Sequence, residues 1–362
     1  MKNGPQQLHD AGQSIWLDNV RKGLFTEGTL ATYIRDYAVT GVTSNPSILA
    51  KAITEGDDYD KAIMANVARG VTDPEELVFA LALEDLGEAA DLLRPVFDAT
   101  GGEDGYVSVE VSPTLAHDAG GTVAAGEALF AQAGRPNVMI KVPGTSAGFV
   151  AVEELIAKGI PVNITLLFSP GHYLGAADAY LRGLERRQRE GLPLAVGSVA
   201  SVFVSRWDSA ADARIPKEHR GKLGVHMVQK TYAVYKDLLA TDRWQKLAAG
   251  GAIPQRPLWA STSTKDPNLP DTYYLGRLAA PGSVDTVPEP TLLAFADHGS
   301  VAELLKPDFA HASKTISEVA EHGVDVELLA ADLQAQGAAA FSESWASLLA
   351  QVEDTVAKLG AS

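Results

Sequence analysis

Residues 138–168 read VMIKVPGTSAGFVAVEELIAKGIPVNITLLF, in which an amphipathic segment lies between two apolar runs. Apolar runs of this length, bounded by turn residues, predict strands over Val138–Val142 and Pro161–Phe168, with a helix over Ala147–Lys158. Two strands joined through a helix are typical of a parallel β-α-β unit. The stretch therefore predicts an α/β protein with a parallel sheet.

The same alternation continues on both sides of this stretch. Further strands are predicted at Ser14–Asp18, Val39–Ser44, Tyr106–Val111, Leu194–Val204, Pro257–Ser261 and Val284–Val287. Amphipathic segments lie at Glu75–Leu93, Thr122–Gln132, His172–Arg189 and Val225–Ala240. About eight parallel strands are the number that closes a (β/α)8 TIM barrel. We predict one such barrel, and a doubly wound open sheet is the alternative.

The chain is longer than a minimal barrel. It has 362 residues, whereas a single (β/α)8 barrel takes roughly 250. The surplus falls in two long gaps between strands and in a C-terminal region predicted to be helical, including Asp325–Gln336 and Phe341–Leu359. No Pro/Ser-rich linker marks a second domain. We therefore predict a single domain over residues 1–362, with the barrel core at about 14–290 and C-terminal helices at about 291–360.

The composition excludes several classes of function. The 46 acidic and 30 basic side chains give a net charge of −16, which repels nucleic acids and anionic membrane surfaces. The absence of cysteine excludes disulfides, thiolate zinc sites, iron–sulfur clusters and a cysteine nucleophile. Residues 1–10 are polar and no long apolar run occurs. We therefore expect a cytoplasmic protein without a signal peptide or a membrane span.

Polar side chains interrupt four of the predicted strands, although parallel strands buried on both faces are usually apolar. The two-residue alternation places them opposite the aliphatic residues and toward the C-terminal strand ends, where barrel enzymes build their active sites. These residues are Asp18, Glu110, Lys141, Asn163 and Thr165. Each has a structural alternative: a turn for Asp18, a buried ion pair for Glu110 with Lys141, and ordinary strand positions for the other two. Because buried polar groups cost stability unless they are satisfied, five on one face indicate a functional site.

Lys141 is the candidate nucleophile, because a neutral lysine amine attacks a carbonyl to form a Schiff base. Asp18, Glu110 and Thr165 are residue types that move protons or hold water in such chemistry. The eight histidines lack the H-x-H and H-E-x-x-H spacings of metal sites, and no nucleotide-binding glycine motif is present. We therefore predict neither a metal nor a cofactor.

Short motifs in a fixed order complete the sequence pattern. They are Trp16-Leu17-Asp18, Thr43-Ser44-Asn45-Pro46-Ser47, Val109-Glu110-Val111, Ile140-Lys141-Val142-Pro143-Gly144-Thr145 and Val162-Asn163-Ile164-Thr165-Leu166-Leu167-Phe168-Ser169. In these motifs the chain resembles the transaldolases, (β/α)8-barrel enzymes that use a Schiff-base lysine. Its long gaps and extra C-terminal helices resemble full-length transaldolases more than the compact fructose-6-phosphate aldolases.

The resemblance implies a role for each motif residue. Lys141 would form the Schiff base, Asp18 would be the general acid and base, and Glu110 and Thr165 would hold the water of imine formation and hydrolysis. The residues implied to bind the dihydroxyacetone unit are Thr43, Asn45 and Asn163. For Asn45 a helix cap followed by Pro46 is the structural alternative.

The resemblance also implies a binding region for the rest of the substrate. Ser201 and Phe203 would lie at the sugar and Arg206 at its phosphate, with a surface ion pair to Asp208 as the alternative for Arg206. The family's second phosphate motif, Ser-Phe-Arg, is replaced by Ser261-Thr262-Ser263-Thr264-Lys265. Ser261 is kept, and we assign the missing charge to Lys265, for which a solvated loop position is the alternative.

The implied activity is transaldolase: transfer of a dihydroxyacetone unit from sedoheptulose 7-phosphate to glyceraldehyde 3-phosphate, giving erythrose 4-phosphate and fructose 6-phosphate. The expected partners are therefore sugar phosphates, in the non-oxidative pentose phosphate pathway, and no oligomeric state is predicted. Two alternatives stay open. One is an aldolase that releases free dihydroxyacetone, and the other is a non-catalytic barrel that only binds sugar phosphates.

Overall fold

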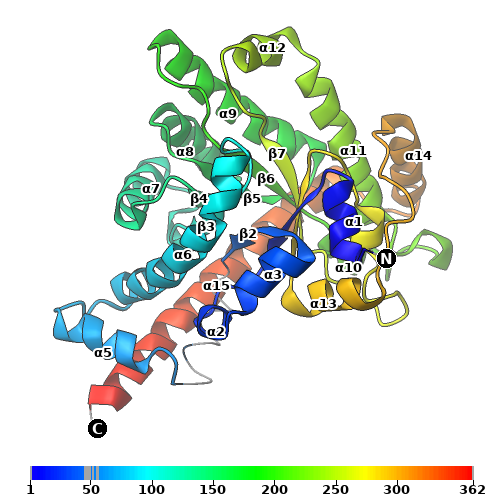
Figure 1. Cartoon of the computed structure of the whole chain (residues 1–362). Helices are drawn as coiled ribbons and strands as arrows, with labels where there is room; N and C mark the ends of the chain where they lie inside the picture. Colours follow the sequence, from blue (N-terminus) through cyan, green and yellow to red (C-terminus); the bar gives the residue numbers. More distant parts are fainter. Residues whose placement is uncertain (1, 45–49, 51–52, 54–56, 361–362) are drawn as a thin grey trace.

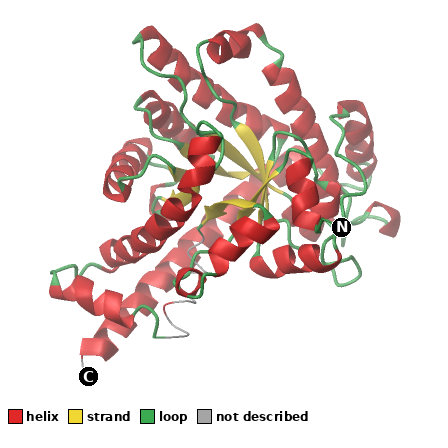
Figure 2. Ribbon diagram, in the orientation of Figure 1, coloured by secondary structure: helices red, strands yellow, loops and turns green. Residues whose placement is uncertain are grey.

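A closed barrel of eight parallel strands forms the centre of the computed structural model, which describes residues 2–44, 50, 53 and 57–360. The strands lie in chain order, and β8 closes the barrel by pairing with β1. They are β1 (Ser14–Leu17), β2 (Val39–Thr43), β3 (Val107–Glu110), β4 (Val138–Pro143), β5 (Val162–Leu167), β6 (Ser198–Phe203), β7 (Arg256–Ala260) and β8 (Val284–Val287). Figure 2 shows these strands ringed by helices. The predicted (β/α)8 TIM barrel is confirmed, and the open-sheet alternative is wrong.

Helices cover the outside of the barrel (Figure 1). Asp118, Thr145 and Ser169 begin three of them, and each side chain accepts the backbone N–H three residues on, which the helix itself leaves unbonded. The elements between the strands are α2 (Gly23–Thr26), α3 (Thr29–Tyr37), α5 (Asp60–Ala68), α6 (Pro74–Ala99), η1 (Pro113–Leu115), α7 (Ala119–Ala133), α8 (Ser146–Ala157), α9 (Pro170–Arg189), α10 (Ser205–Ala211), η2 (Lys217–His219), α11 (Leu223–Leu239), α12 (Asp242–Ala249) and η3 (Leu275–Arg277). Before and after the strands lie α1 (Gly4–Asp10), α13 (Glu289–His298), α14 (Phe309–Ala320) and α15 (Val326–Gly360).

One predicted strand is shorter than expected. The strand predicted from Leu194 begins at Ser198, because the chain before it makes a tight turn in which the Val196 N–H donates to the Leu194 carbonyl at 2.8 Å. The other predicted strands agree with the structure to within one residue at each end.

Four strands, β1, β3, β4 and β5, direct their aliphatic side chains to one face as predicted. The outward-facing aliphatic residues are buried in one core with the surrounding helices: Ile15, Leu17, Val107, Val109, Ile140, Val142, Val162 and Ile164. Inside the barrel, register pairs Glu110 with Lys141 and Lys141 with Asn163 across adjacent strands. These three residues therefore lie next to one another at one level of the barrel.

The N-terminal ends of the strands are joined by a polar cluster of Ser14, Trp16, Asp104 and Arg256, which we call the barrel floor. One Asp104 carboxylate oxygen accepts the Trp16 indole N–H at 2.9 Å, and the other accepts the Ser14 hydroxyl at 2.5 Å. Arg256 lies 3.4 Å from Asp104 and donates to Ser14 and to the Glu103 carbonyl. Both oxygens of this buried carboxylate are therefore bonded.

The inserted and trailing helices pack on each other in a second apolar cluster, which we call the satellite core. It joins α5, α6 and α15 through Ile63, Leu77, Leu81, Trp345, Leu348 and Val352. The Trp345 indole N–H donates to Glu75 of α6 at 3.0 Å. Figure 1 shows the C-terminal end of α15 beside α5, while the rest of the helix runs behind the strands.

The sequence predicts two C-terminal helices, at Asp325–Gln336 and Phe341–Leu359. The helical structure is confirmed, but the break between them is wrong, because both segments belong to the single helix α15. Gly337, at the predicted break, stays helical. A Cβ atom there would lie 2.8 Å from Leu166 Cδ2, so the glycine permits close packing on the barrel instead of ending the helix.

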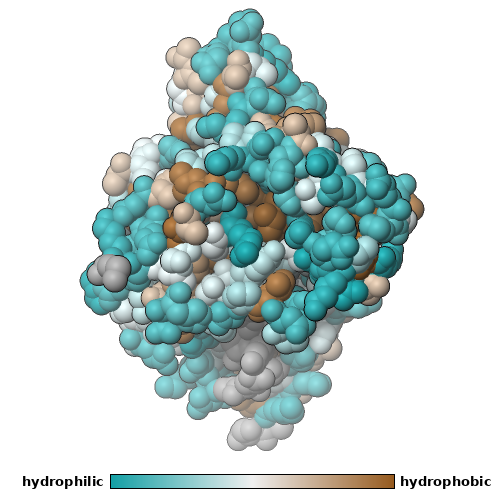
Figure 3. Space-filling view, turned by 90° about the vertical axis from the view of Figure 1, so that its right-hand side faces the viewer, coloured by the Kyte–Doolittle hydropathy of each residue, from teal (hydrophilic) through white to brown (hydrophobic). Residues whose placement is uncertain are grey.

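One face of the molecule is mainly polar. Figure 3, which shows the side of the molecule at the right of Figure 1, has hydrophilic side chains over most of this face and apolar ones in recesses between them. No helix within the described ranges is long and apolar enough to cross a bilayer.

Candidate active site

The C-terminal ends of the strands form the barrel mouth, where the structure brings together Asp18, Glu110, Lys141, Asn163 and Thr165. Asp18 directly follows β1 and is half-buried, whereas the other four lie within β3, β4 and β5 and are buried. Lys141 keeps 8% of its surface exposed, and Asn163 and Thr165 keep none. The mouth is therefore a polar site enclosed by apolar walls.

An ion pair lies at the centre of the mouth. Lys141 Nζ is 3.0 Å from Glu110 Oε2 and donates to the Ser44 carbonyl at 3.3 Å. Burial raises the pKa of the Glu110 carboxyl, and the nearby Lys141 ammonium opposes that shift. A carboxyl of this kind is suited to exchange a proton with the amine beside it.

Asp18 is held by a chain of hydroxyl groups. Thr43 Oγ1 donates to Asp18 Oδ1 at 2.9 Å and lies 2.7 Å from Thr286 Oγ1 of β8. Burial raises the pKa of the Asp18 carboxyl, while Lys141 and the Thr43 hydrogen bond act in the opposite direction. Thr286 was not predicted from the sequence; its only signal is its place near the end of the last strand.

Asn163 is fixed on both sides by serine hydroxyls. Its amide nitrogen donates to Ser108 Oγ at 3.1 Å, and its amide oxygen accepts from Ser201 Oγ at 2.7 Å. Two of the predicted site residues, Asn163 and Ser201, are thus hydrogen-bonded to each other. Ser108 was missed because serine is unremarkable in a strand.

Two polar atoms in the mouth have no hydrogen-bond partner among the described residues. They are Glu110 Oε1 and Thr165 Oγ1. Buried polar atoms are nearly always bonded to protein or to water, so these two mark where water or a ligand group would bind. The next residue, Leu166, has a φ of 61°, a backbone strain often found at functional sites.

A pocket of about 490 Å³ opens beside the mouth and brings the predicted phosphate residues together. It is lined by Ser205, Arg206, Ser209, Ala210, Ser261, Lys265, Leu333 and Gln336. Ser261, just after β7, has a φ of 57°, and its hydroxyl lies 2.9 Å from that of Ser205. Ser205, Leu333 and Gln336 were missed by the sequence reasoning.

The charges in this pocket are available to a ligand. Asp208, the predicted alternative partner of Arg206, instead accepts from the Tyr274 hydroxyl at 2.7 Å and from the Gly224 N–H. Across the part of the chain that the structure describes, Arg206 forms no ion pair, and its guanidinium lies 6.0 Å from the Phe203 ring centre. Within the described residues, Lys265 donates a hydrogen bond to Ser263 Oγ at 2.8 Å and forms no ion pair.

Comparison with known proteins decides the family. Residues 15–352 match the family model described as Transaldolase/Fructose-6-phosphate aldolase. The chain belongs to this family. A protein from Frankia alni named Transaldolase is 43% identical over 369 residues, covering 99% of both chains. Proteins named Transaldolase 1 from Streptomyces avermitilis and Transaldolase from Thermobifida fusca are each 44% identical, covering 98% and 97% of this chain and 96% and 98% of their own.

Family membership confirms the resemblance predicted from the motifs and makes the chain an enzyme of the transaldolase type. Of the residues given a role from the motifs, Asp18, Glu110, Lys141, Asn163 and Thr165 lie at the barrel mouth, and Arg206, Ser261 and Lys265 line the adjoining pocket. Asn45 lies outside the described residues.

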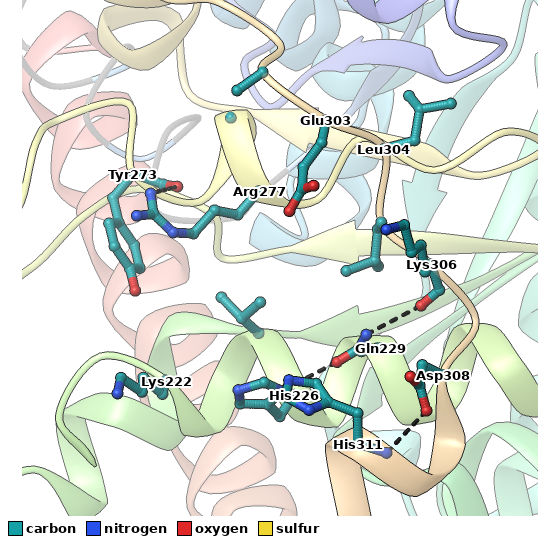
Figure 4. A pocket seen from close by; sticks show the side chains of 14 residues that line it. Lys222, His226, Gln229, Tyr273, Arg277, Glu303, Leu304, Lys306, Asp308 and His311 are labelled. Carbon is teal, nitrogen blue, oxygen red and sulfur yellow. Dashed lines mark hydrogen bonds between the residues drawn. The ribbon is translucent and has the colours of Figure 1, made fainter. Parts of the chain in front are cut away.

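A larger hollow of about 680 Å³ lies elsewhere, between α11, α14 and the 302–308 segment (Figure 4). Its side chains include Lys222, His226, Arg277 and Glu303, and it contains none of the residues in the family motifs. The strands contribute nothing to it. The mouth is therefore the candidate active site.

No metal site competes with this assignment among the residues that the structure describes, since no three His, Cys, Asp or Glu side chains there are grouped to hold an ion. The chemical groups available at the mouth are an amine, two carboxyls and several hydroxyls. These are the groups that Schiff-base chemistry requires.

Proposed function

We propose that the protein transfers a dihydroxyacetone unit from sedoheptulose 7-phosphate to glyceraldehyde 3-phosphate through a Schiff base on Lys141. The observation that carries this proposal is the buried Lys141 amine, 3.0 Å from Glu110, at the mouth of a barrel whose adjoining pocket contains Arg206. The names of the full-length relatives support transaldolase as the activity.

Schiff-base formation begins with a proton transfer. Lys141 passes a proton to Glu110, whose raised pKa suits it to accept one, and the free amine attacks the ketose carbonyl carbon. The carbinolamine then loses water to give an iminium ion. Glu110 Oε1 and Thr165 Oγ1, which have no partner among the described residues, are suited to hold this water and to return it during hydrolysis.

Asp18 serves as the general base and acid. It removes the proton from the substrate hydroxyl on the β-carbon, and the bond between the α- and β-carbons breaks. The electron pair of this bond moves into the iminium group, leaving an enamine on Lys141 and an aldehyde product. Addition of the enamine to the acceptor aldehyde reverses these steps, and Asp18 returns the proton.

The remaining residues bind the substrate. Thr43, Asn45 and Asn163 hold the hydroxyls of the dihydroxyacetone unit, and Ser201 and Phe203 line the path to the phosphate. Arg206, Ser261 and Lys265 bind the phosphate, for which the planar guanidinium of arginine is well shaped. Because the chain carries a net charge of −16, such local cations are needed to attract an anionic sugar.

Borohydride reduction with fructose 6-phosphate tests the covalent step. We expect a dihydroxyacetone-derived mass increase on the Lys141 peptide, and no increase in Lys141→Met. An unmodified Lys141 peptide during turnover would refute the mechanism.

A donor assay with and without an acceptor aldehyde separates transfer from release of free dihydroxyacetone. Turnover that requires the acceptor supports transaldolase, whereas equal turnover without it supports the aldolase alternative. We further propose that the enzyme acts in the non-oxidative pentose phosphate pathway, which the name Transaldolase of its relatives supports, and that it does so in the cytoplasm.

A further inference from the structure

Helix α15 crosses the barrel mouth and contacts the strand ends directly. The Gln334 side-chain amide donates to the carbonyls of Gly144 and Leu166, both at 2.9 Å. One turn later, Gly337 packs so closely on Leu166 that a Cβ atom would lie 2.8 Å from it. These contacts fix the height of α15 above β5.

The same face of α15 places an aromatic ring over the amine. Gly337 and Phe341 are four residues apart and therefore lie on one side of the helix. The Phe341 ring centre is 5.6 Å from Lys141 Nζ, and the side chain packs, half-buried, against the apolar cluster inside the barrel.

The satellite core holds the ring in place from the other side. Trp345, one turn beyond Phe341, is buried against Phe79 with ring centres 5.3 Å apart and is bonded to Glu75. The helix is thus anchored both before and after Phe341. An aromatic group held in this way keeps its position when a ligand binds or leaves.

We propose that Phe341 is a positioning residue that shields the Lys141 intermediate from bulk water and so makes transfer to an aldehyde faster than hydrolytic release. The proposal rests on the Schiff-base function above. After cleavage, the enamine has two fates. In one, its carbon bonds to the acceptor aldehyde. In the other, that carbon takes a proton, water adds to the resulting iminium carbon, and dihydroxyacetone leaves as the Lys141 amine is restored.

Water access decides between these fates. Both fates end with one water molecule adding to an iminium carbon, but only the second also needs a proton on the enamine carbon, which bulk water would supply, whereas the first uses the acceptor aldehyde instead. An apolar ring above the nitrogen removes the space through which bulk water would enter, while Glu110 and Thr165 retain the water needed after transfer. Phe341 therefore favours the transferase outcome over the aldolase outcome within one and the same site.

The test measures a ratio of products in Phe341→Ala and Phe341→Leu. Each variant is supplied with fructose 6-phosphate, and free dihydroxyacetone release without acceptor is divided by transfer with an acceptor aldehyde. We expect this ratio to rise about fivefold in Phe341→Ala and less in Phe341→Leu, which keeps most of the apolar volume. A loss of structure alone would lower both rates and leave the ratio unchanged.

Phe309→Ala is the matched control. Phe309 lies on α14, 46% exposed, with the ammonium of Lys230 4.9 Å from its ring centre, so this variant removes a similar contact far from the mouth motifs. Its product ratio should equal that of the unaltered enzyme.

Borohydride trapping in the same variants keeps the two proposals separate. Without an adduct on Lys141 in the unaltered enzyme, the Schiff-base function fails, and the shielding role fails with it. With an adduct present but the same product ratio in Phe341→Ala and Phe341→Leu, only the shielding role is overturned.

Discussion

The two ends of the barrel each bury a carboxylate beside a cation, yet the two clusters differ in how completely they are bonded. On the floor, both oxygens of Asp104 are bonded and Arg256 also reaches a backbone carbonyl. At the mouth, Glu110 Oε2 accepts a hydrogen bond from Lys141, whereas Glu110 Oε1 has no hydrogen-bond partner among the described residues. A carboxylate whose two oxygens are both hydrogen-bonded within the protein contributes to the stability of the fold. A carboxylate with one oxygen unbonded can still accept a hydrogen bond from a substrate.

Of the three non-glycine residues with a positive φ angle in the described part of the chain, two lie at the mouth end of the barrel, and the third, Ala38, directly precedes β2. Leu166 and Ser261, with positive φ angles, both lie at C-terminal strand ends, and burial raises the pKa of Asp18 and Glu110 there. Strained backbone angles and buried carboxyls lower the stability of the fold, and both are common among residues that take part in catalysis. We therefore expect substitutions at the mouth to affect activity and substitutions on the floor to affect stability.

The largest effect is expected for Lys141→Met at the mouth. Turnover should fall by about 1,000-fold or more because the amine that is proposed to form the Schiff base is removed. Circular dichroism and urea unfolding should show a folded protein, since Glu110 can remain protonated once its cation is gone. Substantial residual turnover would break the assignment of the mouth as the reactive end.

On the floor, Arg256→Met should lower the free energy of unfolding by about 3 kcal/mol because it leaves the buried Asp104 without its cation. Turnover per folded molecule should stay within about twofold of the unaltered enzyme, since a floor residue does not meet the substrate. Urea unfolding monitored by tryptophan fluorescence gives the first quantity. Arg35→Met, which removes the exposed pair with Asp36, should cause no measurable change.

Asp18→Asn is a substitution at the mouth, where we expect turnover to change more than stability does. Turnover should fall about 100-fold because the general base is lost. Because the folded-state pKa of Asp18 is raised, folding favours the protonated acid, and this contribution is lost as the pH rises through the folded-state pKa. The unaltered protein should therefore lose stability relative to Asp18→Asn as the pH rises above about 4, the ordinary aspartate pKa, as followed by thermal unfolding across pH. If the difference in stability between the unaltered protein and Asp18→Asn does not change with pH, burial does not raise the pKa of Asp18.

The smallest effect is expected for Thr286→Val, which removes the hydroxyl next to Thr43. Turnover should fall about tenfold as Asp18 loses part of its orientation, with little change in KM. Thr231→Val, a buried change on α11 away from the mouth, is the control and should leave kcat unchanged. Equal losses in both variants would indicate general destabilisation.

Much of this contrast could be predicted from the sequence. The alternation within each strand placed Glu110, Lys141, Asn163 and Thr165 on the inner face, and the order of strands and helices predicted the barrel. The fold and the family are confirmed, while the roles of the individual residues stay predictions. Asn45 lies among the residues that the structure does not describe.

Other features depend on contacts that a sequence pattern does not contain. Thr286 and Ser108 were missed because hydroxyl residues are ordinary in strands, and only the closed barrel brings Thr286 next to Thr43. The continuity of α15 was missed because Gly337 resembles a helix break. Its reason, the close approach of Leu166, belongs to the tertiary structure.

The position of α15 in the chain also orders events during synthesis. Every strand precedes α15, so the barrel residues leave the ribosome first and the helix that covers the mouth emerges after them. Until then Lys141 has no aromatic cover and α6 has no Trp345 to pack against. A nascent chain that still lacks α15 therefore leaves the Lys141 amine without the cover of Phe341, and the arrival of α15 is the step that adds this cover.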